Sequence, residues 1–140
     1  MRSLFLLLLL GCPAHAWEAS IGRICTLRHE EPQADMRLTF DPAGPEYSIT
    51  VTLNGKEWRP NPVFSIAFEG PVGLTISTGR HQIGGASVTV TDSGFGNVLN
   101  GLEYNWSARA ILGDQEISVS LAGAAPAVRA FRACVAAPTA

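Results

Sequence analysis

The chain has 140 residues, of which 46% are hydrophobic, and its 10 basic and 12 acidic side chains give a formal net charge of −2 at pH 7. Nucleic acids and anionic membranes bind clustered positive charge, and no run of lysine or arginine occurs here. We therefore expect no nucleic-acid partner. The length is that of one domain, which is enough to enclose a single hydrophobic core.

The first residues contain the three parts of a cleavable export signal. Arg2 supplies positive charge, residues 4–10 form an apolar run, and a small-residue triplet follows at 14–16. The run is far shorter than the roughly 20 apolar residues that a membrane-spanning helix needs. We predict a signal peptide at 1–16 and a single β-rich domain at 17–140. That domain is expected in the periplasm or secreted, with no transmembrane segment after cleavage.

Removal of the signal changes the number of cysteines from three to two. Cleavage takes away Cys12 and leaves Cys25 and Cys134 in an oxidising compartment, where paired cysteines form disulfides. We predict one disulfide between Cys25 and Cys134, which ties the start of the domain to its end. The alternative is a reactive thiol, but neither cysteine lies in a Cys-x-x-Cys motif or beside a pair of basic residues.

A second form of processing is also open. The segment Leu9-Leu10-Gly11-Cys12 resembles the lipobox of bacterial lipoproteins, in which the cysteine becomes the lipidated first residue. Pro13 and the Ala-x-Ala triplet at 14–16 favour ordinary cleavage. Anchoring to a membrane through Cys12 is the alternative localisation.

Strand-like segments dominate the remaining sequence. The clearest is 47–53, in which apolar and polar residues alternate, and Asn54-Gly55 after it predicts a tight hairpin with a return strand at 56–58. Further strands are expected at 24–29, 36–41, 63–69, 74–78, 87–91, 107–112 and 116–121, the last two joined by a turn at Gly113-Asp114. About eight short strands with frequent turn signals predict a mainly β fold, an antiparallel β-sandwich or barrel.

Two segments have helical rather than alternating spacing. Apolar residues in 95–104 predict a short helix over the sheet, with Asn97 as a possible cap. The alanine-rich segment near 125–133 predicts a C-terminal helix that directs Phe131 and Cys134 inward. This helix would bring Cys134 towards Cys25.

Two groups of residues have the chemistry of a site but not its spacing. His29, with Glu30 and Glu31, could bind a metal, but adjacent strand residues face opposite ways, so a solvated turn is the preferred interpretation. Ser77, His81 and Asp92 are the residue types of a hydrolytic triad. No serine lies in a Gly-x-Ser-x-Gly elbow. We therefore assign no catalytic residue, metal or cofactor.

Binding residues are sought among the aromatic side chains. Trp58 and Arg59 lie in a proline-rich connection, where side chains commonly project outward, and Trp106 follows the predicted short helix. Trp58, Arg59 and Trp106 are the predicted binding surface. Residues 59–62 are the candidate for a rigid, protruding inhibitor loop.

Three segments carry a resemblance to known proteins. Residues 17–25, 94–99 and 121–134 resemble small uncharacterised secreted proteins of alphaproteobacteria, and the last segment is similar to the C-terminal region of the invasion-associated locus B family. The resemblance implies a periplasmic β-rich protein and supplies no catalytic residue.

The leading functional hypothesis is an exported binding or interaction module without catalytic activity, whose partner is another envelope protein. A small periplasmic hydrolase that uses Ser77, His81 and Asp92 is one alternative. An inhibitor of an envelope or foreign enzyme is the other.

Overall fold

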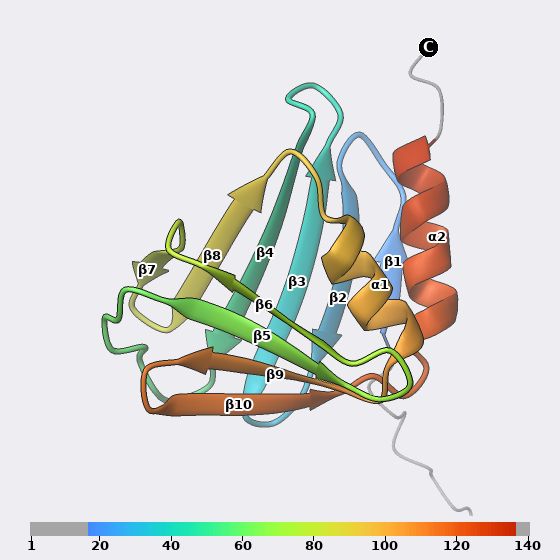
Figure 1. Ribbon diagram of the computed structural model, residues 1–140. Coiled ribbons are helices and arrows are strands. Elements are labelled where there is room, and N and C mark those ends of the chain that lie inside the picture. Colours follow the sequence, from blue (N-terminus) through green and yellow to red (C-terminus); the bar gives the residue numbers. More distant parts are fainter. Residues whose placement is uncertain (1–16, 137–140) are drawn as a thin grey trace, which may run out of the picture.

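The computed structural model describes residues 17–136, so the predicted signal peptide and Cys12 lie outside the described residues. The described chain is mainly β, with two antiparallel sheets and two helices (Figure 1). One sheet has six strands in the order β1-β2-β3-β4-β8-β7, and the other has four in the order β10-β9-β5-β6. The elements are β1 (Glu18–Ser20), β2 (Cys25–Glu30), β3 (Ala34–Asp41), β4 (Glu46–Leu53), β5 (Phe64–Glu69), β6 (Leu74–Thr78), β7 (Gln82–Gly84), β8 (Ser87–Asp92), α1 (Gly96–Tyr104), β9 (Ser107–Leu112), β10 (Gln115–Ser120) and α2 (Ala124–Ala136).

The predicted β-sandwich is confirmed. Figure 1 shows the strands of the four-stranded sheet crossing those of the six-stranded sheet steeply, as in sandwiches whose sheets pack close to orthogonally. Both helices lie on the side of β1 and β2, and β7 and β8 lie on the other side. The strands β1 and β7 were not predicted, because three residues are too few to show a period-two pattern.

The hairpin predicted at Asn54-Gly55 is wrong. β4 is paired along one edge with β3 and along the other with β8, so a return strand at 56–58 has no edge to join. Instead the backbone N–H of Trp58 donates to the carbonyl of Gly85, at 3.0 Å. Gly55 has a φ of 75°, which only turns the chain away from the sheet.

The second predicted hairpin is confirmed. β9 and β10 pair directly across the turn, where Leu112 lies opposite Gln115. Gly113 has a φ of 61°, the left-handed conformation that two-residue hairpin turns require.

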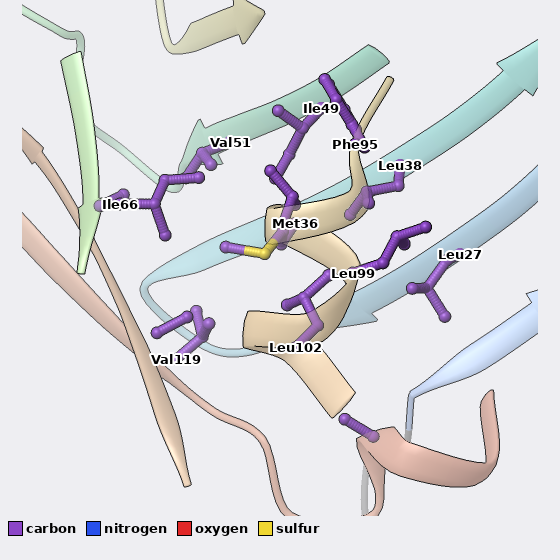
Figure 2. Close-up of a cluster of buried hydrophobic side chains, with 14 of the residues drawn as sticks. Leu27, Met36, Leu38, Ile49, Val51, Ile66, Phe95, Leu99, Leu102 and Val119 are labelled. Atoms are coloured by element: carbon purple, nitrogen blue, oxygen red, sulfur yellow. The ribbon is translucent and has the colours of Figure 1, made fainter. Parts of the chain in front are cut away.

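The inner faces of the sheets and one face of α1 form a single core. Figure 2 shows Met36, Leu38 and Ile49 of the six-stranded sheet directed towards Leu99 and Leu102 of α1. Alternation along each strand places these apolar side chains on one face. The other members of the cluster include Leu27, Val51, Ile66, Phe95 and Val119.

The short helix was predicted in the right place but with the wrong cap. The helix begins at Gly96, its N-cap is Phe95, and no side chain caps it, so Asn97 lies within the first turn. Phe95 is buried beside Tyr47, with ring centroids 5.2 Å apart. Apolar anchoring of the preceding residue therefore sets the start of α1 instead of a polar cap.

The predicted disulfide joins the C-terminal helix to the six-stranded sheet. Cys25 on β2 and Cys134 on α2 are bonded, with Cα atoms 6.2 Å apart and a sequence separation of 109 residues. Val128 and Phe131 of α2 are fully buried against the core. The disulfide and this apolar face together fix α2 against β1 and β2.

Replacing Cys134 by serine should lower the free energy of unfolding by about 2–5 kcal/mol, because a crosslink across a long loop restricts the unfolded chain. Urea denaturation followed by circular dichroism measures the loss. Dithiothreitol should destabilise the wild type similarly and leave the variant unchanged. Equal urea midpoints for the oxidised wild type and the variant would contradict a stabilising disulfide.

Gly101 sets how closely α1 approaches the four-stranded sheet. A Cβ atom at this position would overlap ring carbons of Phe68, which is itself buried in the core. The helix therefore lies directly on the Phe68 ring, and this contact requires a residue without a side chain.

Gly101→Ala should lower the free energy of unfolding by about 1–3 kcal/mol through overpacking, although alanine is the better helix former. The matched control is Gly96→Ala in the same helix, where open space surrounds the position. That variant should be neutral or slightly stabilised. Thermal denaturation of both variants checks the pair, and equal stabilities would contradict the close contact.

Candidate functional site

An apolar pocket of about 500 Å³ lies between the two sheets, bounded by β6 on one side and β8 on the other. This volume is in the range of small-ligand pockets. Its lining comes from β4, β5, β6, β8 and the start of α1: Ile49, Phe64, Ile66, Ile76, Ser77, Thr78, Val90, Asp92, Gly94, Phe95, Gly96, Asn97 and Val98.

Cross-strand pairs build the walls of this pocket. Ile49 on β4 lies opposite Val90 on β8, and Ile66 on β5 lies opposite Ile76 on β6. Ile49 and Ile66 are buried, whereas Val90 and Ile76 are only partly covered because they lie nearer the margin of the sandwich. The pocket therefore has a buried apolar floor and a partly exposed apolar rim.

The polar residues of the lining are few. Among the lining residues, Asp92 alone is charged, and its exposed carboxylate accepts a hydrogen bond from the backbone N–H of Ser93 at 2.6 Å. Ser77 alternates with Ile76, so its hydroxyl lies on the outer face of the sheet, 2.7 Å from the hydroxyl of its cross-strand partner Ser65. Thr78 Oγ1 accepts from the backbone N–H of Arg80 at 3.0 Å. The site can hold an apolar group below a single carboxylate.

The suggested hydrolytic residues make their hydrogen bonds with other groups. Ser77 and Asp92 both line the pocket, but Ser77 bonds to Ser65. The Nε2 atom of His81 lies 2.8 Å from the carbonyl oxygen of Asn61. These three side chains are thus not assembled into a hydrogen-bonded triad.

The predicted binding surface does not form as one patch. Trp58 is only 4% exposed, and its Nε1–H donates to the carbonyl of Val51, at 3.1 Å, so its ring belongs to the core. Arg59 is exposed near the β9–β10 turn. Trp106 is 73% exposed and lies directly before the start of β9, at the other end of that strand. The prediction failed for Trp58 because β4 and Phe64 provide an apolar site for its ring.

Residues 59–62, the proposed inhibitor loop, are tied to neighbouring segments. The backbone N–H of Arg59 donates to Gln115 Oε1 at 2.6 Å, and its guanidinium donates to Asp114 Oδ1 at 2.6 Å. This hydrogen bond, with the Arg59 charge, holds the pKa of the Asp114 carboxyl below its usual value. The segment is therefore fastened to the β9–β10 turn at its first residue.

His29 lies in the core and not in a solvated turn, so that expectation was wrong. Its ring stacks on Trp17 with centroids 4.7 Å apart, and its Nε2 atom lies 2.8 Å from Glu31 Oε2. The same carboxylate oxygen accepts the backbone N–H of Ser120 at 2.7 Å. Alternation from Cys25 already places His29 on the inward face of β2. Within residues 17–136, no three His, Cys, Asp or Glu side chains form a group that could hold a metal.

The sequence reasoning missed the pocket. The alternation in 63–69, 74–78 and 87–91 identified its apolar residues as inward-facing, but did not show that β6 and β8 would leave space between them. The space between two sheets depends on the angle at which they cross, and this angle cannot be predicted from the sequence of any one strand.

No family model, curated protein or solved structure matches the chain. Among the helices of residues 17–136, none is long and apolar enough to span a membrane.

Proposed function

We propose that this protein is an exported binding module without catalytic activity, which takes up an apolar group of its ligand between β6 and β8. The pocket carries this proposal. Its floor consists of buried aliphatic and aromatic side chains, and its mouth carries a few polar groups, the arrangement typical of ligand sites. Filling it would remove the rim residues Ile76 and Val90 from water, and burial of apolar surface favours binding.

Binding is favoured over hydrolysis by the hydrogen bonds that Ser77 and His81 make. A nucleophilic serine needs a base within hydrogen-bonding reach, and Ser77 bonds to Ser65 while His81 bonds to Asn61. The serine is therefore not activated as a nucleophile, and Asp92 remains as the one charged lining group that can orient a ligand.

Export to the periplasm or the medium is the second part of the proposal. The signal-like residues 1–16 support it, and so does the disulfide between Cys25 and Cys134, because such bonds persist in oxidising compartments. Lipid anchoring through Cys12 is the alternative form of the same export.

The apolar dye Nile red should bind the wild-type protein saturably, with increased fluorescence. Ile76→Asp should weaken this binding at least about tenfold, because it places a charge in the apolar wall. Val90→Thr, which keeps the shape of valine, should weaken it less. Fluorescence titration gives both dissociation constants.

The matched control for the dye experiment is Val72→Asp, since Val72 is 53% exposed and lies outside the pocket lining. It should bind the dye like the wild type. Near-ultraviolet circular dichroism establishes that the variants are folded. Absence of saturable binding, or equal binding by Ile76→Asp and Val72→Asp, would refute the proposed pocket function.

Intact-mass spectrometry of protein isolated after export should give a chain that starts at Trp17 and lacks both thiol hydrogens. A lipidated chain that starts at Cys12 would establish the anchored form. A chain that retains Met1 and free thiols would contradict export.

A further inference from the structure

Two strand edges with free backbone groups border the pocket. Within residues 17–136, β6 pairs with β5 alone, which leaves its other edge unpaired. β7 pairs with β8 only at Ser87–Thr89, so the outer edge of residues 90–92 is unpaired as well. Exposed N–H and C=O groups of this kind are templates for pairing with another chain.

The β6 edge lacks the usual features that prevent such pairing. Proteins commonly protect edge strands with charged residues, proline or a bulge. β6 has the sequence Leu-Thr-Ile-Ser-Thr, without charge or proline, and its register with β5 is continuous from Leu74 to Thr78. Although α1 contacts β6, no second strand pairs with it in the described chain.

The two features coincide in space. Ile76, Ser77 and Thr78 belong to the free edge of β6 and also line the pocket. Val90 and Asp92 likewise belong to the unpaired edge of β8 and line the pocket. A strand added at β6 would thus direct alternate side chains towards the pocket, because side chains alternate between the two faces of a strand.

We propose that the ligand is an extended segment of a partner protein that adds as a strand to β6 and inserts one apolar side chain into the pocket. This inference rests on the proposed function and names its ligand class. The carboxylate of Asp92 at the mouth selects a lysine or arginine two positions from the apolar residue, since residues i and i+2 share a face. Backbone pairing contributes affinity, and the pocket contributes specificity.

Other occupants satisfy fewer of these features. A small apolar molecule fills the pocket but leaves the backbone groups of β6 unpaired. A second copy that pairs through its own β6 has Thr78 two positions after Ile76 and offers no positive charge to Asp92. The charge at the mouth therefore favours a partner with a different sequence.

Random displayed peptides of about ten residues, the length of a long strand, provide the test when selected on the oxidised, exported protein. The enriched peptides should carry an apolar residue with lysine or arginine two positions away. Bound peptide should protect the amides of β6 and residues 90–92 from hydrogen exchange. Methylating alternate backbone nitrogens of the peptide, on the edge that pairs with β6, should weaken binding at least about tenfold. The methylated nitrogens can no longer donate hydrogen bonds.

Matched variants separate charge, pocket and edge. Asp92→Asn should weaken the selected peptides about threefold, as for an exposed ion pair. Glu18→Gln, on the opposite margin of the six-stranded sheet, should leave binding unchanged. Ile76→Asp should weaken binding at least about tenfold, and Val72→Asp should not.

Each remaining outcome overturns the proposal that a ligand both pairs with β6 and fills the pocket. Sensitivity to Ile76→Asp without sensitivity to backbone methylation would leave the pocket function standing and remove strand pairing. Edge protection without Nile red binding would remove the pocket function and keep edge pairing alone. Absence of enriched peptides, or self-association through β6 in sedimentation, would remove the heterologous strand.

Discussion

The contact between Gly101 of α1 and the ring of Phe68 determines how the sandwich is closed at one end. Because no side chain intervenes at Gly101, the helix lies directly on β5 while Leu99 and Leu102 reach the six-stranded sheet. Phe95 and Val98 at the start of the same helix line the pocket. One helix therefore both completes the core and forms an end wall of the cavity.

The margin of the sandwich at β6 and β8 is closed less completely. α2 is held on β1 and β2 by Phe131 and by the Cys25–Cys134 bond, so the helical cover is concentrated on one side. At the margin formed by β6 and β8, apolar side chains are partly exposed and backbone edges are unpaired. Burial of the apolar side chains is favourable, and the free backbone edge is a template for a further strand, so one extended ligand with an apolar side chain would use both features.

Side-chain contacts beyond the strand pattern account for two residues whose burial could not be predicted. The proline-rich surroundings of Trp58 predict an exposed side chain. In the structure its ring donates a hydrogen bond to the carbonyl of Val51 and packs against Phe64. The neighbouring glutamates of His29 predict a polar turn. In the structure its ring stacks on Trp17 and lies within hydrogen-bond distance of Glu31. In each case a tertiary partner compensates for burial of a polar group, which a local rule cannot anticipate.

The sequence by itself determined the mainly β architecture, the positions of most strands, both helices and the pairing of Cys25 with Cys134. These follow from local periodicity, turn residues and cysteine count, which are properties of neighbouring residues or of composition. Only the tertiary structure decided the strand order, the absence of the Asn54-Gly55 hairpin and the pocket beside Ile76. Strand order depends on which edges are already occupied, and the pocket depends on how two sheets cross, so both are set by non-local packing.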